Sequence, residues 1–198
     1  MNRITLYLLL FAVVLSSACV PSAPETTERT ASDPLTTGET SSIELTSDAF
    51  APGQPIPPKH ACTGDASSSL KDISPALSWG EPPAGTQSFA LIMDDPDAPG
   101  GTWVHWVIFN IPASARVLPE SMPADETLPD GSMSGNNSWG RTGYGGPCPP
   151  SGTHRYFFKL YALDEMLAIS AGAGKGELEK AMVGHILAKG ELMGTFTK

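Results

Sequence analysis

The chain alternates between short apolar runs and segments rich in Pro, Gly and Ser, a pattern typical of a β protein with many turns. Apolar and β-branched residues concentrate in runs that predict strands at residues 42–46, 76–79, 88–93, 103–110 and 155–163. In the longer runs, apolar residues occupy both alternating sets of positions, which predicts central strands covered on both faces. Residues 191–196 have room for a last short strand.

Helical spacing marks one further segment, residues 176–188. Its recurring positions are Leu178, Ala181, Met182, His185 and Ile186, and Gly190 is the expected stop. Residues 133–142 are instead rich in Gly, Ser and Asn and predict a long loop. Because this loop precedes a polar cluster, it is a candidate rim of a pocket.

The N-terminal segment does not have the pattern of a folded domain. Arg3 precedes an almost continuous apolar run at residues 4–15, and small residues then lead to Cys19. The run is too short for a spanning helix and predicts a signal peptide over residues 1–18. A cysteine directly after small residues resembles the lipobox of bacterial lipoproteins, so we predict that Cys19 carries lipid. An ordinary secretory signal with a chance cysteine is the alternative.

Residues 19–42 are rich in Pro, Thr, Ser and Glu and predict a flexible tether, because they bury too little apolar surface to offset ordering entropy. A coil of this length has a mean span of roughly 25–30 Å. The folded domain is then residues 43–198, held outside the cytoplasm in the cell envelope. Val20 after the cysteine resembles the outer-membrane sorting pattern, which predicts an anchor in the outer membrane facing the periplasm or the cell surface.

Composition narrows the class of protein. A chain of 198 residues with 40% hydrophobic residues suits one domain with its own core. The net charge of -9, from 21 acidic and 12 basic residues, repels nucleic acid and excludes it as a partner. With 19 Pro, 20 Gly and only 17% charged residues, a mostly β domain is favoured over a helical bundle.

Two polar clusters stand beside predicted strands. The first is Asp95-Pro96-Asp97-Ala98-Pro99, followed by Trp103-Val104-His105-Trp106. The second is Gly145-Gly146-Pro147-Cys148-Pro149-Pro150-Ser151-Gly152-Thr153-His154-Arg155-Tyr156. Of the four histidines, only His105 and His154 lie in these clusters, whereas His60 and His185 do not. We therefore predict one pocket at strand ends, built from segments far apart in the sequence.

The residue types in the clusters suit a small oxyanion. Prolines preorganise the loops, and Gly145 and Gly146 would let backbone N–H groups approach a ligand. Protonated histidines and the Tyr156 hydroxyl would add donors. The aspartates would repel an anion, so we expect them to support the site: Asp95 nearer the pocket, holding a histidine, and Asp97 stabilising the turn. The alternative is that both histidines only satisfy buried backbone groups.

Both clusters resemble the signature motifs of the phosphatidylethanolamine-binding protein family, and Ser74-Pro75-Ala76-Leu77-Ser78-Trp79 resembles its bacterial Raf-kinase-inhibitor-like branch. The resemblance implies a mainly β fold, an antiparallel Greek-key β-sandwich with a few short helices. It also implies an anion pocket at Asp95, Pro96, Trp103, His105, Gly146, Pro147, His154 and Tyr156, to which the residue chemistry adds Asp97 and Gly145. Residues 66–72 resemble an insertion relative to the family pattern.

Cys62 and Cys148 remain besides Cys19. In an exported protein an even pair favours a disulfide, although two buried free thiols are the alternative. A bridge closing so long a loop would stabilise the fold by about 4–5 kcal/mol. Since Cys148 lies in the second cluster, the bridge would brace the pocket wall.

Three functions are compatible with this pattern. The first is a non-enzymatic protein that binds a phosphorylated or carboxylated ligand or lipid head group, without a cofactor. The second is an inhibitor or regulator of a peptidase or kinase, whose protein partner the sequence does not name. The third is an enzyme using His105, His154 and Asp95 as a metal site or as acid–base groups. The chain lacks the Gly-x-Ser-x-Gly, His-Glu-x-x-His and P-loop motifs, so no catalytic residue is predicted.

Overall fold

The computed structural model describes residues 40–62 and 72–198. The predicted signal peptide, Cys19 and the tether up to residue 39 lie outside the described residues, as does the predicted insertion apart from Asp72. Within the described residues, no helix combines the length and apolarity that a membrane span requires.

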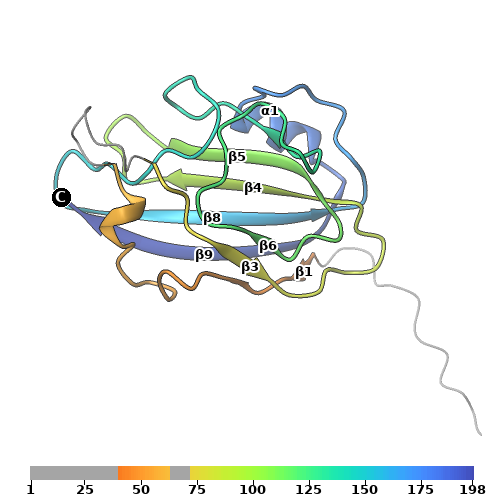
Figure 1. Cartoon of the computed structure of the whole chain (residues 1–198), viewed down its shortest axis with the longest axis horizontal. Coiled ribbons are helices and arrows are strands. Elements are labelled where there is room, and N and C mark those ends of the chain that lie inside the picture. The colour runs from red at the N-terminus through yellow and green to blue at the C-terminus, as the bar shows by residue number, and fades with distance from the viewer. Residues whose placement is uncertain (1–39, 63–71) are drawn as a thin grey trace, which may run out of the picture. The chain divides into compact units, whose positions relative to one another are not determined.

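The larger sheet has six strands in the order β1-β9-β8-β4-β5-β7 (Figure 1). The bounds of these strands along the chain are β1 Ser41–Ser42, β4 Ser88–Asp95, β5 Trp103–Pro112, β7 Met133–Ser134, β8 Thr153–Leu163 and β9 Ile186–Thr197. Neighbours are antiparallel except β1 and β9, which are parallel. The predicted antiparallel arrangement therefore holds for all but this edge pair.

The smaller sheet has three antiparallel strands in the order β2-β3-β6, and in Figure 1 it crosses in front of the larger sheet. Its strands are β2 Leu45–Thr46, β3 Leu77–Trp79 and β6 Val117–Leu118. The described residues also form one α-helix, α1 Lys175–Ala181, and one 3-10 helix, η1 Pro58–His60. The predicted mainly β sandwich with short helices is confirmed.

The main core fills the space between the sheets. Leu77 and Trp79 from the smaller sheet pack with buried side chains of the larger one, including Phe89 and Phe158. Trp79 and Phe89 meet edge to face, with ring centroids 5.3 Å apart. Because each fully buried side chain of this size contributes about 1.5–3 kcal/mol, this layer supplies much of the stability that holds the strand ends in place.

A second core covers the outer face of the larger sheet. Leu178 and Met182, from α1 and the turn after it, pack on Ile92 and Phe109 of β4 and β5. All eight residues of β4 are buried as a result. The prediction of a central strand covered on both faces is confirmed for β4.

Two element predictions were wrong at their ends. Residues 42–46 do not form one strand, because β1 and β2 belong to different sheets. The chain passes from one sheet to the other beside β9, and it runs so close that a Cβ at Gly190 would lie 2.5 Å from the Ile43 carbonyl oxygen. The predicted helix over residues 176–188 ends at Ala181. Gly184, with φ of +87°, turns the chain, and Ile186 already starts β9, so Gly190 is a strand residue and not a helix stop.

Residues at two predicted boundaries also belong to strands. Ser41 and Ser42, assigned by their composition to the tether, pair with Ala188 and Lys189 of β9. The predicted loop over residues 133–142 begins with β7, which pairs with Ile108 and Phe109 of β5. Both are edge strands of two residues, too short for a hydrophobic period to reveal.

Candidate functional site

Three strand ends meet at one end of the larger sheet. β4 ends at Asp95, and its antiparallel neighbours β5 and β8 begin beside it, with Asp95 opposite Trp103 and Asp94 opposite Phe157. Antiparallel pairing thus brings the two polar clusters together, although they are about fifty residues apart in the sequence. This end of the larger sheet is where the sequence analysis predicted a pocket.

A cavity of about 230 Å³ lies at these strand ends. Of the predicted site residues, Asp95, Trp103, His105 and His154 line it. Cys148, predicted to brace the pocket wall through a disulfide, also lines it, whereas the sequence analysis did not select the remaining lining residues, Ala98, Pro99, Trp139 and Pro150, as ligand-binding residues. Trp139 comes from the Gly-, Ser- and Asn-rich segment that was predicted as a pocket rim.

Asp95 connects the two polar clusters at the cavity. It is 3% exposed, and its Oδ2 accepts a 2.7 Å hydrogen bond from Nδ1 of His154. Its Oδ1 accepts a 2.8 Å bond from the backbone N–H of Asp97. Both oxygens are therefore occupied by groups of the protein. This arrangement places the hydrogen of a neutral His154 on Nδ1 and leaves Nε2 for a ligand.

Asp97 has a different role from the one predicted. It does not line the cavity, and instead accepts bonds of 2.9 and 2.7 Å from the Arg155 guanidinium and one of 3.0 Å from the Arg155 backbone N–H. These hydrogen bonds lower the pKa of Asp97 to about 2. Asp95 stabilises the turn, whereas Asp97 fastens that turn to the start of β8.

His105 is held from the opposite wall of the cavity. Its Nδ1 donates to the carbonyl of Gly145 over 2.8 Å, and the side chain is buried. Burial lowers the pKa of His105, because desolvation of the imidazolium outweighs the raising effect of the Gly145 carbonyl and of Asp95. We therefore expect His105 to be neutral near pH 7, with Nε2 unprotonated.

Tyr156 does not line the cavity but lies directly behind it. Its ring meets that of His105 edge to face, with centroids 5.1 Å apart. The residue is fully buried, and its hydroxyl makes no hydrogen bond of standard geometry among the described residues, although the Cys148 backbone and the Asp95 carboxylate are close enough to affect its pKa. Burial, followed by the charge of Asp95, raises the pKa of Tyr156, so the hydroxyl stays protonated and able to donate. A buried polar group without a partner is costly and calls for an explanation.

Gly145 and Gly146 do not act as the sequence analysis predicted. The N–H of Gly145 donates to the carbonyl of His105 over 2.8 Å, and the N–H of Gly146 donates to Asp72 Oδ1 over 2.8 Å. Neither donor is left for an anion, so the prediction of a backbone anion site here was wrong. The glycines permit close packing instead: a Cβ would lie 2.3 Å from Trp139 at Gly145 and 2.6 Å from the Ala61 backbone at Gly146.

Pro147 and the disulfide complete this wall. Cys62 and Cys148 are bonded, and the N–H of Cys62 donates to the carbonyl of Pro147 over 3.0 Å. Since Cys148 lines the cavity, the bridge ties the cavity wall to the segment after η1. Pro96, like Pro147, lies near the site without lining the cavity.

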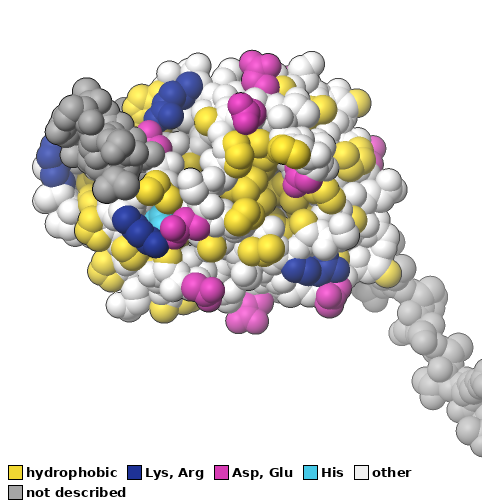
Figure 2. All heavy atoms as spheres, in the orientation of Figure 1, with side chains coloured by type: hydrophobic (Ala, Val, Ile, Leu, Met, Phe, Trp, Pro, Cys, Tyr) yellow, Lys and Arg dark blue, Asp and Glu magenta, His cyan; other side chains and the backbone are white. Residues whose placement is uncertain are grey.

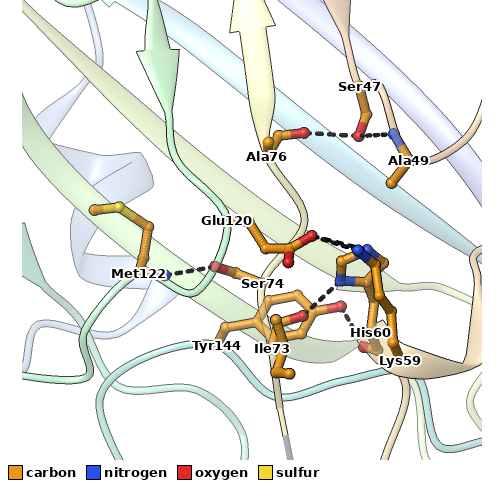
Figure 3. A network of polar contacts seen from close by, with 10 residues as sticks. All are labelled: Ser47, Ala49, Lys59, His60, Ile73, Ser74, Ala76, Glu120, Met122 and Tyr144. Carbon is orange, nitrogen blue, oxygen red and sulfur yellow. Dashed lines mark hydrogen bonds and ion pairs between the residues drawn. The ribbon is translucent and has the colours of Figure 1, made fainter.

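Behind the wall is a polar network that the sequence did not reveal (Figure 3). His60 is fully buried, with Nδ1 2.8 Å from the carbonyl of Ile73, and its own carbonyl accepts a 2.8 Å bond from Tyr144 Oη. Burial lowers the pKa of His60, so its neutral form is favoured. Lys59 pairs with Glu120 over 2.6 Å beside it. This network fixes the segment on which Gly146 packs.

Other parts of the molecule are less suited to anion chemistry. A larger cavity of about 600 Å³ lies beside residues 42–46 and the β8 and β9 strands, with Lys159, Lys189 and Glu191 in its lining. It contains no histidine and no buried unpaired donor. Across residues 40–62 and 72–198, no three His, Cys, Asp or Glu side chains are placed to hold a metal ion. The smaller cavity is therefore the candidate site.

Comparison with known proteins gives the family. The family model described as phosphatidylethanolamine-binding protein matches residues 46–197, which is most of the chain. The chain belongs to this family. A relative from Methanothermobacter thermautotrophicus, named UPF0098 protein, is 47% identical over 156 residues, covering 79% of this chain and 99% of the relative. A second UPF0098 protein, from Aquifex aeolicus, is 45% identical, covering 79% of this chain and 89% of the relative.

Solved structures of family members have the same fold. A homolog of the phosphatidylethanolamine-binding protein from Chlamydia trachomatis has a TM-score of 0.70 and 40% identity, covering 79% of this chain and 98% of that one. The E. coli protein YBCL, described as a new member of the mammalian PEBP family, has a TM-score of 0.72 and 32% identity, covering 80% and 99%. The coverage shows that the match is to the folded domain.

Proposed function

We propose that this member of the phosphatidylethanolamine-binding protein family is a non-enzymatic binding protein for a small anionic group, phosphoryl or carboxyl. The ligand would carry this group as a lipid head group, a metabolite or a modified peptide. One observation carries the proposal: His105 and His154 line the same cavity, and the Nδ1 atom of each is already engaged, so both Nε2 atoms are left for a ligand. Once protonated, these Nε2 atoms are charge-assisted donors for an oxyanion in the cavity, and the buried Tyr156 hydroxyl behind His105 is a further donor.

The proposed binding depends on protonation of the histidines. Backbone N–H groups of the glycines are engaged elsewhere, so positive charge must come from imidazolium. A bound anion favours the protonated form of an imidazole that it contacts, and both His105 and His154 line the cavity. By linkage, affinity for the anion is highest when the histidines are protonated and falls as the pH rises.

The test is a calorimetric titration with inorganic phosphate and with sulfate, at about pH 5.5 and about pH 8. Sulfate keeps its charge over this range, so its affinity reports only the protein. We expect tighter binding of both anions at the lower pH. Equal affinity at the two pH values, or binding at neither, would show the proposal to be wrong.

A matched pair of variants isolates the hydroxyl. Tyr156→Phe removes the unpartnered group, and we expect about a tenfold loss of anion affinity without loss of stability. Tyr161→Phe removes a hydroxyl from the other face of β8 and should leave affinity unchanged. If both variants bind phosphate like the wild type, Tyr156 does not contact the ligand.

We further propose that Cys19 is lipidated and that the tether holds the domain outside the cytoplasm, at the outer membrane facing the periplasm or at the cell surface. The support is the signal-like N-terminus followed by small residues and a cysteine. Labelled palmitate should be incorporated by the wild type and not by Cys19→Ser. Labelling of both, or of neither, would contradict the proposed anchor.

A further inference from the structure

Two exposed indoles stand at the mouth of the cavity. Trp103 is 37% exposed and Trp139 is 42% exposed, although most large apolar side chains of this domain are buried. Their rings meet nearly at right angles, with centroids 5.4 Å apart, and Trp139 also meets His105 edge to face at 5.1 Å. Both indoles line the cavity. Exposed aromatic surface continuous with a polar cavity is typical of a ligand site.

Trp139 is held in place by specific contacts. Its backbone N–H donates to Asn137 Oδ1 over 3.0 Å, and the absence of a side chain at Gly145 leaves room for its ring. The Arg141 guanidinium lies over the ring, 5.7 Å from its centroid, and is itself paired with Asp72 over 2.6 Å. Asp72 also accepts from the N–H of Gly146. The Trp139 ring, the Arg141 guanidinium and the cavity wall at Gly146 are therefore linked through Asp72.

The cavity is larger than a bare oxyanion requires. A tetrahedral oxyanion has about as many heavy atoms as five waters, which occupy roughly 150 Å³ at about 30 Å³ each. The cavity of about 230 Å³ therefore leaves space beyond the anion, and both indoles belong to its lining. The polar groups Asp95, His105 and His154 are in the same lining as the apolar side chains of Pro99 and Pro150. This mixed lining suits a ligand that carries both an anionic group and an apolar group.

We propose that Trp103 and Trp139 form an outer subsite that selects phosphomonoesters whose organic part is an uncharged ring, in preference to inorganic phosphate and to esters with a cationic amine. This inference rests on the proposed anion site and names the class of ligand. Arg141 decides against the amine: its guanidinium already occupies the cation position over Trp139 and is held there by Asp72, so a ligand cation finds that position filled. An uncharged ring stacks on the indoles without needing that position.

The test compares three probes on the full chain: inorganic phosphate, phenyl phosphate and phosphoethanolamine. We expect phenyl phosphate to bind roughly threefold to tenfold more tightly than phosphate, and phosphoethanolamine no more tightly than phosphate. Trp139→Leu should remove most of the advantage of phenyl phosphate, while Trp139→Phe, which keeps a ring, should retain part of it. Met166→Ala changes another exposed apolar side chain, outside the cavity lining, and is the control.

Arg141→Gln tests the discrimination separately. It should raise the affinity for phosphoethanolamine relative to phosphate, with Trp fluorescence altered because the cation over the indole is lost. Equal affinities for phosphate and phenyl phosphate, or an equal loss of both in Trp139→Leu, would overturn the outer subsite and leave the anion site standing. Failure of all three probes to bind would overturn the anion site itself, and the subsite with it.

Discussion

Asp94 and Asp95 are neighbours in β4, both are buried, and they serve opposite purposes. Alternation along the strand points them to opposite faces of the larger sheet. Asp94 is 1% exposed and accepts bonds from Lys159 at 2.8 and 3.0 Å and from Lys175 at 2.6 Å. Asp95 accepts bonds from His154 and from the Asp97 backbone. One carboxylate thus has two ammonium partners, and the other has a titratable ring.

The partners decide what each carboxylate can do. Burial lowers the pKa of Lys175, but its hydrogen bond to Asp94 and the charge of Asp94 outweigh that effect and raise the pKa. The Lys175 ammonium therefore stays charged over the physiological range, and the ion pairs of Asp94 connect β4, β8 and α1. His154, the partner of Asp95, instead lines the cavity and has a second ring nitrogen for a ligand. A buried carboxylate next to a histidine indicates a site, whereas one saturated by lysines indicates structure.

Removing the disulfide should have the largest effect on stability at the cavity end. Replacing Cys62 and Cys148 together by alanine is expected to lower the free energy of unfolding by about 4–5 kcal/mol, because the bridge closes a long loop. Anion affinity should also fall, since Cys148 lines the cavity. Urea denaturation and phosphate titration measure the two effects. Unchanged stability would mean that the bridge does not constrain the unfolded chain.

Asp94→Ala should affect stability and not binding. Two lysines would lose their shared anion, and we expect a loss of about 3 kcal/mol in the free energy of unfolding, at the lower end for such clusters because the lysines are partly exposed. Phosphate affinity should stay within about twofold of the wild type, since the change is on the other face of the sheet. A large fall in affinity would refute the division between the two faces.

Asp95→Asn should reverse that result. Losing the carboxylate that orients His154 is expected to reduce anion affinity by roughly tenfold to a hundredfold, with a smaller loss of stability than in Asp94→Ala. Calorimetry gives the affinity, and the shift of the His154 ring resonances with pH gives the effect on its protonation. If the affinity and the titration of His154 are both unchanged, Asp95 does not support the site.

The pH dependence of stability should be the smallest effect. The folded pKa of His105 lies below its ordinary value of 6.5, so the unfolded chain binds more protons as the pH falls below that value. The contribution of His105 to the free energy of unfolding is therefore fully present above about pH 6.5. It is lost on acidification, by at most about 1.4 kcal/mol per pH unit for one proton. His105→Gln should reduce the slope. Saturating sulfate should also reduce it, because the anion favours the protonated ring; a slope insensitive to both would exclude His105 as its source.

The sequence predicted the strands that build the site, but not all of the residues that form its walls. Long apolar runs revealed β4, β5 and β8, since burial on both faces leaves a continuous hydrophobic signal. The sequence also singled out Asp95, Trp103, His105 and His154, because polar residues beside Pro and Gly turns are conspicuous. Trp139 and Asp72 were not selected, because each lies in a polar segment. Only the tertiary packing places Trp139 against Gly145 in the cavity lining and bonds Asp72 to the N–H of Gly146.

The sequence by itself determined the fold class, the family and which segments contain the site, because these follow from local patterns of burial and from motifs. Only the tertiary structure decided the role of each group. It assigned the glycine N–H groups to internal partners, Asp97 to Arg155, and the two oxygens of Asp95 to His154 and a turn. It also left the Tyr156 hydroxyl without a partner. Hydrogen-bond partners distant in the chain are set by strand register and loop packing, which no local pattern encodes.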